Sequence, residues 1–241
     1  MMDVAIALGH PSYLWREGQE RRLQLIRRYA TLEGARILDV GCGLGLYVKK
    51  MRQFSDDVHG VDIDPAKVRE ASATLPNIQE APAEHLPYPD ATFDVLLLHE
   101  VLEHVNDDRA AVREAHRVLK PGGRMVVFVP NRLYPFETHG IYWRGTYHFG
   151  NYLLVNYLPD FLRAKLCPHV RAYTYRSLRR LFAQLPGRIV VHRYLFAGYD
   201  NIIARRPALG RILRRVTYAL EGTPLSFLGL SHFLVYERAR S

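Results

Sequence analysis

The hydrophobic pattern of the first half of the chain alternates between short apolar runs and amphipathic stretches. A leading amphipathic helix is predicted over residues 13–29, and further helices follow Gly45, begin at Pro65 and cover 109–119. The apolar runs of strand length lie at 37–40, 58–61, 77–80, 93–98 and 124–129. Because strands and helices alternate strictly, the pattern predicts an α/β fold with a parallel sheet and helices on both of its faces.

The pattern changes after the last of these strands. A Pro-Gly-Gly turn signal at 121–123 predicts the end of the preceding helix. Residues 131–170 then show little periodicity and are rich in aromatic residues and histidines. Such a long irregular connection is typical of a lid or binding loop. We therefore expect an insertion over the carboxyl edge of the sheet, with a separate small aromatic core as the alternative.

Regular segments resume after the insertion. A basic helix is predicted over 174–184, a strand over 189–194, an amphipathic helix over 204–220 and a last strand over 231–237. The helix over 204–220 either packs against the domain or lies on a membrane surface. We expect a single domain over 1–241. Its predicted parts are an N-terminal helical cap (1–35), a core (36–130), an insertion (131–173) and C-terminal helices and strands (174–241).

Charge is divided unevenly along the chain. Residues 1–130 carry 16 Lys and Arg against 19 Asp and Glu, whereas residues 131–241 carry 17 against 5. The basic C-terminal half suits contact with an anionic membrane or another phosphate-bearing partner. No apolar run reaches about 18 residues and no secretory signal pattern is present, so we expect a cytoplasmic protein with a peripheral contact at the inner membrane surface. The two cysteines, Cys42 and Cys167, predict neither a disulfide framework nor a zinc motif.

The clearest chemical signal is the stretch ILDVGCGLG at 37–45. A loop without side chains at the carboxyl end of a parallel strand lets a ligand approach the backbone closely. Its GxGxG spacing differs from the GxGxxG of dinucleotide-binding proteins, which argues against a nicotinamide oxidoreductase. Asp62 ends the next strand, where a carboxylate binds ribose hydroxyls. Asp39 lies before the loop, where an ionised carboxylate would order the turn or reach an ammonium group through water. Taken singly, the glycines also fit a bare turn and Asp62 a helix N-cap.

Four motifs in this order resemble the class I S-adenosylmethionine (SAM)-dependent methyltransferases. They are ILDVGCGLG, GVDID, APAEHLPYPDATFDVLLLHEVLEHV and EAHRVLKPGGRMVVFVPN, and they cover about residues 36–130. The EVLEHV variant is most similar to the subset that contains ubiquinone-type O-methyltransferases and many enzymes that act on sugars and lipids. The resemblance implies a Rossmann-like, doubly wound, mostly parallel sheet of seven strands and SAM as the methyl donor.

The resemblance also implies the cofactor contacts. The glycines would pass along the methionine part of SAM, Asp62 would bind both ribose hydroxyls, and Ile63 would pack on the adenine. Ala83 and Glu84 would lie at the adenine rim. Many family members have Asp where this chain has Pro82, which removes a side-chain acceptor for the adenine amino group. The full set of expected cofactor-binding residues is Asp39, Gly41, Gly43, Gly45, Asp62, Ile63, Ala83, Glu84 and His99.

Methyl transfer to a hydroxyl requires alignment of the acceptor and removal of its proton. Histidine suits the second task because its pKa lies near neutrality. The expected catalytic residues are His104, after the fourth strand, and His139, from the insertion, while His99 is expected to line the cofactor through its backbone. If the segment after His99 is helical, Glu100, Glu103 and His104 share a face and either hold a divalent ion or orient the imidazole. A polar helix start is the alternative, and no metal site is predicted.

The acceptor is expected to bind the insertion through Tyr142, Trp143 and His148. The motifs NRLYPFETHG and NYLPDFLR loosely resemble insertions in methyltransferases associated with glycan and glycolipid assembly. The leading prediction is O-methylation of a small-molecule, sugar or lipid-linked hydroxyl. RNA methylation ranks second and nucleic acid is not the expected partner, because no RNA-binding module or Asn/Asp-Pro-Pro-aromatic signature is present. A non-catalytic SAM-binding adaptor is a third hypothesis, since a fold does not fix a function.

Overall fold

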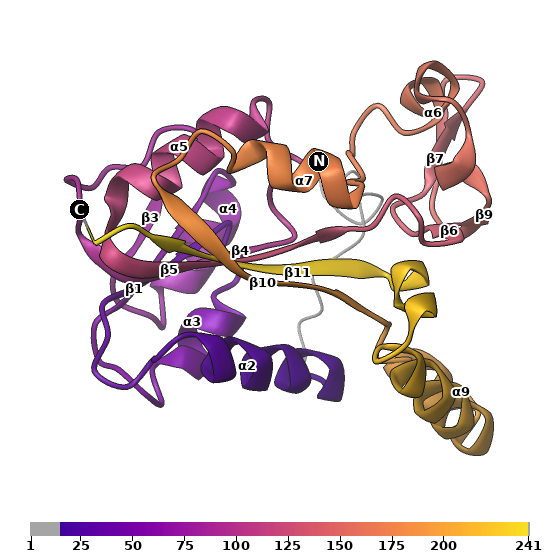
Figure 1. Ribbon diagram of the computed structural model, residues 1–241, viewed down its shortest axis with the longest axis horizontal. Helices are drawn as coiled ribbons and strands as arrows, with labels where there is room; N and C mark the ends of the chain where they lie inside the picture. Colours follow the sequence, from indigo (N-terminus) through magenta and orange to yellow (C-terminus); the bar gives the residue numbers. More distant parts are fainter. Residues whose placement is uncertain (1–14, 241) are drawn as a thin grey trace.

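The computed structural model describes residues 15–240, so the predicted start of the leading helix at residues 13 and 14 lies outside the described part. The strands of the main sheet are β1 (Ile37–Val40), β2 (Val58–Asp62), β3 (Ile78–Glu80), β4 (Phe93–His99), β5 (Leu119–Pro130), β10 (Gly187–Leu195) and β11 (Ser231–Arg238). Their order is β10-β11-β5-β4-β1-β2-β3, and β11 alone runs antiparallel to the other six strands (Figure 1). The predicted Rossmann-like sheet of seven mostly parallel strands is confirmed.

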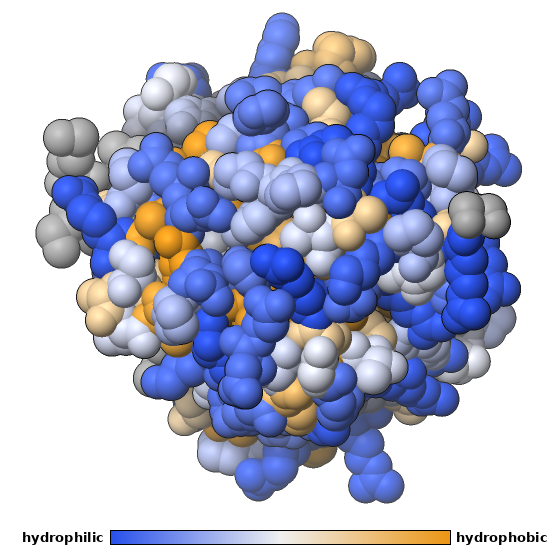
Figure 2. Space-filling model, turned by 90° about the vertical axis from the view of Figure 1, so that its left-hand side faces the viewer, coloured by the Kyte–Doolittle hydropathy of each residue, from blue (hydrophilic) through white to orange (hydrophobic). Residues whose placement is uncertain are grey.

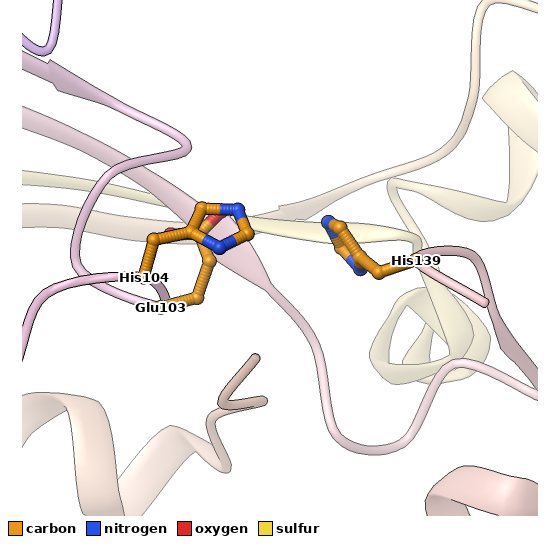
Figure 3. A group of neighbouring side chains, drawn as sticks. All are labelled: Glu103, His104 and His139. Carbon is orange, nitrogen blue, oxygen red and sulfur yellow. The ribbon is translucent and has the colours of Figure 1, made fainter. Parts of the chain in front are cut away.

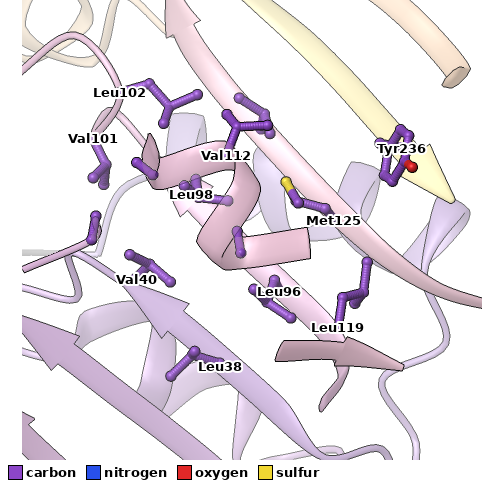
Figure 4. Close-up of a cluster of buried hydrophobic side chains, with 14 of the residues drawn as sticks. Leu38, Val40, Leu96, Leu98, Val101, Leu102, Val112, Leu119, Met125 and Tyr236 are labelled. Atoms are coloured by element: carbon purple, nitrogen blue, oxygen red, sulfur yellow. The ribbon is translucent and has the colours of Figure 1, made fainter. Parts of the chain in front are cut away.

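Helices cover both faces of this sheet. The helices of the described residues are α2 (Glu17–Tyr29), α3 (Leu46–Met51), α4 (Pro65–Ser72), α5 (Asp108–Val118), α6 (Asp160–Leu166), α7 (Tyr175–Leu181), α8 (Asp200–Arg205) and α9 (Pro207–Leu220), with the 3-10 helices η1 (Val155–Tyr157) and η2 (Pro224–Leu228), and those over the sheet faces are α2, α3, α4, α5 and α7. Neighbouring strand residues point to opposite faces, so Leu38 packs with α5 and α7 while Ile37 packs with α2 and α3. Figure 4 shows the first of these clusters, in which Leu96 and Met125 of the central strands lie beside α5. The central strands are buried on both faces and therefore hold the carboxyl edge of the sheet rigidly.

The start of β5 differs from the prediction. The Pro-Gly-Gly turn at 121–123 does not separate helix from strand but lies within β5. Phe93 pairs with Leu119 and Val95 pairs with Arg124, so the residues between the two pairs bulge outward. Strand pairing therefore begins directly after α5, and the turn signal marks a bulge.

The single helix predicted over 204–220 is in fact two helices, α8 and α9. They separate at Arg206, whose backbone has φ −141° and ψ 78°. The cause is Pro207, because a residue before proline disfavours helical backbone angles. Pro207 itself occupies the first turn of α9, where proline is well tolerated.

Two parts project beyond the sheet at the same end of the molecule, the insertion lobe (131–170) and α9 (Figure 1). The lobe follows the carboxyl end of β5, and α8 and α9 follow the carboxyl end of β10, which is parallel to β5. Within the lobe, two small two-stranded sheets pair β6 with β9 and β7 with β8. Their strands are β6 (Phe136–Glu137), β7 (Ile141–Trp143), β8 (Thr146–His148) and β9 (Tyr152–Leu153). The parallel strands therefore point their carboxyl ends toward both projecting parts.

The opposite end of the molecule presents mainly hydrophilic residues with smaller hydrophobic groups among them (Figure 2). Among residues 15–240, no helix has the length and apolar content needed to cross a bilayer.

Candidate active site

Three glycines shape the loop between β1 and α3, and all three have positive φ angles: Gly41 (71°), Gly43 (54°) and Gly45 (75°). A Cβ on Gly41 would stand 2.4 Å from Val101, and one on Gly45 would stand 2.4 Å from Leu75. A Cβ on Gly43 would meet no protein atom within 4 Å. The outer glycines therefore serve packing, whereas Gly43 presents bare backbone to open space where a ligand can approach.

Asp62 lies at the carboxyl end of β2, directly beside this loop. Its Oδ2 accepts a hydrogen bond from the Gly43 amide at 2.8 Å, and its Oδ1 accepts one from the Asp64 amide at 2.9 Å. The cap of α4 is Asp64, which accepts from Ala66, and not Asp62 as the simpler interpretation had it. Each carboxylate oxygen of Asp62 keeps a lone pair for a further donor, such as a ribose hydroxyl.

The expected adenine contacts lie next along the same edge. Ile63 is 66% exposed, an unusual position for an isoleucine that directly follows a buried strand. Ala83 is buried, and the Glu84 carboxylate accepts from the amides of Asn106 and Asp107 at 2.8 and 3.3 Å. Ile63 therefore offers an open apolar surface for a flat ring, while Glu84 holds the loop that leads into α5.

Asp39 lies buried at the carboxyl end of β1, and its role toward the cofactor stays a prediction. Its side chain is buried, and burial, followed by the nearby Asp62 charge, raises the pKa of Asp39 well above its ordinary value. The neutral carboxyl is therefore favoured over the ionised acceptor that the sequence predicted.

A network that the motifs did not predict surrounds the end of β4. Arg22, from α2, contacts His99 Nε2 at 2.6 Å and donates to Glu100 Oε1 at 2.8 Å and to Ser231 Oγ at 3.0 Å. Burial and the Arg22 charge lower the pKa of His99 to about 3. Burial opposes ionisation of Glu100, but Arg22 lowers its pKa overall. The only sequence signal for Arg22 was a basic position in an amphipathic helix.

The segment after β4 is a turn and not the helix that would align Glu100, Glu103 and His104. Glu100 has φ +56°, which ends the regular backbone. Residues 100–107 contain no helix, and Glu103 is buried whereas His104 is exposed, so the three side chains do not lie on one helix face. Burial, followed by the charge of Glu100, raises the pKa of Glu103 well above its ordinary value. The predicted shared face is therefore wrong.

The structure brings the two expected catalytic histidines together. The ring centroids of His104 and His139 are 5.6 Å apart in an edge-to-face arrangement. His139 Nδ1 lies 3.0 Å from Glu137 Oε1, and Arg163 Nη2 donates to Glu137 Oε2 at 2.5 Å. Desolvation by the surrounding protein, followed by the His139 charge, lowers the pKa of His104 although its ring stays exposed. Neither Glu137 nor Arg163 was predicted as part of the site.

The expected acceptor residues lie together on the β7–β8 hairpin of the lobe. Ile141 pairs with His148, and Tyr142 and Trp143 follow on the same strand. Trp143 is 56% exposed. The Tyr142 ring stands edge-on to His169, whose Nε2 contacts the His139 carbonyl at 3.0 Å. The hairpin therefore adjoins the histidine pair.

A cavity of about 250 Å³ reaches the end of β4 between α2, the end of β10 and α9. It is polar where Arg22 and His99 line it and more apolar at Leu195 and Phe196, and Tyr218 brings α9 to its wall. Such a cavity matches a ligand that carries both polar and apolar groups.

A bare glycine loop, a carboxylate at the neighbouring strand end and an exposed apolar residue beside it fit a sulfonium nucleoside. Together with the sheet order they define a SAM-dependent methyltransferase. The family model described as "Methyltransferase domain" matches residues 38–127. The chain is 32% identical over 179 residues to the ubiquinone biosynthesis O-methyltransferase of Paraburkholderia phymatum, covering 67% of this chain and 77% of that protein. The protein therefore belongs to the class I SAM-dependent methyltransferases, and SAM is its methyl donor.

Two further comparisons agree. The ubiquinone biosynthesis O-methyltransferase of Xanthomonas oryzae is 30% identical over 158 residues, which cover 59% of this chain and 66% of that protein. A SAM-dependent methyltransferase structure from Mesorhizobium loti superposes with a TM-score of 0.63 at 21% identity, covering 90% of this chain and 96% of that one. At this identity the structural match shows the fold alone.

Proposed function

We propose that the protein methylates a hydroxyl group of a lipid-linked or other amphipathic acceptor. The observation that carries this proposal is the position of the exposed large hydrophobic side chains. Among the described residues there are sixteen, of which eight lie in 136–162 and six in 202–227. These ranges belong to the lobe and to the segment from α8 to η2, which includes α9, so an apolar acceptor or membrane would meet the protein at the cofactor side.

The α9 helix supports contact with an anionic membrane surface. Leu209, Ile212 and Val216 are 52, 62 and 54% exposed, and their spacing places them on one helix face. Arg211 and Arg215 lie on the same helix and are exposed. Apolar side chains flanked by arginines are the composition of a helix that lies in the interface of an anionic bilayer.

The residues at the carboxyl edge have separate roles in the proposed methyl transfer. When bound, SAM supplies a methyl group on a positively charged sulfur. Gly43 and Asp62 hold the nucleoside at the edge. We infer that His104 and His139 assist the loss of the proton from the acceptor hydroxyl, and the Glu137 carboxylate beside His139 Nδ1 fixes the orientation of that ring. The cavity that reaches His99 offers space for the acceptor between the sheet edge and α9.

The acceptor class is tested by incubating the protein with methyl-labelled SAM and cell extract that has been partitioned into lipid, aqueous and RNA fractions. We expect label in the lipid fraction. Label confined to water-soluble metabolites would replace the lipid-linked acceptor with a soluble one. Label confined to RNA would favour the second candidate and contradict the proposal.

The membrane contact is tested by flotation with phosphatidylglycerol-containing vesicles. Ile212→Asp removes an apolar side chain worth about 1.5–3 kcal/mol on burial, so the bound fraction should fall by roughly tenfold or more. Ala73→Asp adds the same charge at the exposed C-terminal end of α4, outside the lobe and α9, and should float as the wild type does. Equal flotation of both variants, or none for the wild type, would remove the membrane from the proposal.

A further inference from the structure

Three side chains with metal-binding atoms converge beside the acceptor side of the sheet edge. Glu103 and His104 come from the turn after β4, and His139 comes from the lobe (Figure 3). One ligand atom from each lies within 4.8 Å of the other two. In Figure 3 the two imidazoles face each other across a gap, with the Glu103 carboxylate behind His104.

The Glu103 carboxyl group has no salt-bridge partner among the described residues, and the charge of the nearby Glu100 opposes its ionisation. The residue is 1% exposed, and neither Oε1 nor Oε2 has a hydrogen-bond partner. A buried carboxyl without partners costs roughly 1–3 kcal/mol, and more if it is ionised. Native proteins retain such unsatisfied groups where a bound ion or substrate supplies the missing partner. A cation beside Glu103 would therefore stabilise the ionised form of this buried carboxyl group.

The two histidines are already oriented as metal ligands. His139 Nδ1 lies 3.0 Å from Glu137 Oε1, and Glu137 is held by the buried Arg163. His104 Nδ1 lies 3.4 Å from the carbonyl oxygen of His169. These contacts occupy Nδ1 of each ring and leave both Nε2 atoms available. Metal-binding histidines characteristically direct their other nitrogen to a carboxylate or a backbone carbonyl in this way.

We propose that Glu103, His104 and His139 bind a divalent transition-metal ion, of which Zn²⁺ is the best match. Two imidazoles and one carboxylate favour Zn²⁺ and related ions over Mg²⁺, which prefers oxygen ligands. With metal–ligand distances of about 2.0–2.2 Å, ligand atoms in a tetrahedral site lie about 3.3–3.6 Å apart. Side-chain rotations that move each ligand atom by about an ångström therefore bring all three within coordination distance of one ion. Three protein ligands leave a fourth position open, as in catalytic zinc sites.

The open position gives the cation a role in catalysis, and this step rests on the proposed function. A hydroxyl oxygen bound to the cation loses its proton to water more readily, because the cation stabilises the alkoxide or phenolate. The oxygen then forms a bond to the methyl carbon while the carbon–sulfur bond breaks. The products are a methyl ether, S-adenosylhomocysteine and one proton released to solvent.

Metal binding is measured directly, without an acceptor, by calorimetry of the metal-free protein with zinc chloride. The wild type should bind one Zn²⁺. Glu103→Gln keeps the shape of the side chain and removes its charge, and His104→Ala changes an exposed residue, so both variants should fold. Each should weaken Zn²⁺ binding at least about tenfold. His85→Ala alters an exposed histidine outside the cluster and should bind Zn²⁺ as the wild type does.

The outcomes separate this proposal from the proposed function. Absence of Zn²⁺ binding by the wild type, or equal binding by all variants, would refute the metal site. Full methyl transfer in the presence of a chelator would refute its role while leaving the O-methyltransferase intact. Zn²⁺ binding that depends on Glu103, without methyl transfer to any hydroxyl acceptor, would support the site and contradict the proposed function.

Discussion

Because the space beside Gly43 is open, a substitution at this residue tests whether the cofactor lies there. Gly43 and Gly34 both have left-handed backbones, with φ of 54° and 66°, and a Cβ on either would meet nothing within 4 Å. Gly34 lies in the loop before β1, outside the glycine loop. Gly34→Ala is therefore a matched control for the backbone strain of Gly43→Ala.

The two substitutions should cost similar stability but differ in ligand binding. Alanine in the left-handed region costs roughly 1–2 kcal/mol, so both unfolding free energies should fall by about this amount. A ligand atom in contact with the Gly43 Cα at about 3.5–4.0 Å would stand about 2.0–2.5 Å from a new Cβ and would have to move by more than an ångström. We expect the affinity for S-adenosylhomocysteine to fall at least tenfold in Gly43→Ala, about 1.4 kcal/mol or more.

Urea denaturation gives the stabilities, and calorimetry with S-adenosylhomocysteine gives the affinities. Gly34→Ala should bind within about twofold of the wild type. If Gly43→Ala bound the nucleoside as tightly as Gly34→Ala did, the bare face of this loop would not be the cofactor contact. A loss of binding in both variants would instead show that backbone strain alone disturbs the site.

Two further predictions follow from buried polar groups. Asp62→Asn should weaken S-adenosylhomocysteine binding about tenfold to a hundredfold in calorimetry, because hydrogen bonds to a charged acceptor are worth about 1.5–3 kcal/mol; unchanged affinity would exclude Asp62 as the ribose ligand. His232 is fully buried and its Nε2 contacts the Tyr173 carbonyl oxygen at 2.8 Å; burial lowers its pKa to about 4, below the unfolded value of 6.5. The unfolded chain binds this proton more readily than the folded protein does. The contribution of neutral His232 to the free energy of unfolding is therefore fully present above pH 6.5, and about 3 kcal/mol of it is lost as the pH falls to 4. Urea midpoints across this window should fall less steeply in His232→Gln, and identical slopes would contradict the assignment.

The cofactor edge could be predicted from the sequence because it depends on local signals. Strand length, glycine spacing and the position of Asp62 are set by segments that follow one another directly in the chain. The division of α8 from α9 also had a local signal in Pro207, which the apolar spacing of the following helix concealed. By contrast, the bulge in β5 depends on the pairing of Phe93 with Leu119, and pairing across a sheet leaves no mark in either segment alone.

The acceptor side could not be predicted in the same way, because its contacts join distant segments. Arg22, in the first helix, donates a hydrogen bond to Glu100, and Arg163, at the end of the lobe, donates one to Glu137. A basic residue in an amphipathic helix is normally solvated, so its sequence neighbourhood gives no reason to assign Arg22 to the site. The buried Glu103 could not be distinguished from an ordinary residue of a helix start until the backbone of the turn was known.

The return segment of the lobe explains how His139 comes to lie beside His104. The Arg171 amide donates to the Glu103 carbonyl at 3.0 Å, and the Tyr173 hydroxyl donates to the Leu102 carbonyl at 2.8 Å. Both bonds join the end of the lobe to the turn that carries Glu103 and His104. The Arg171 guanidinium adds hydrogen bonds to the carbonyls of Val105 and Asn106, so the return segment is held firmly against the turn and sets the position of His139 relative to it. The segment after the lobe therefore positions the histidine pair, which neither segment could do alone.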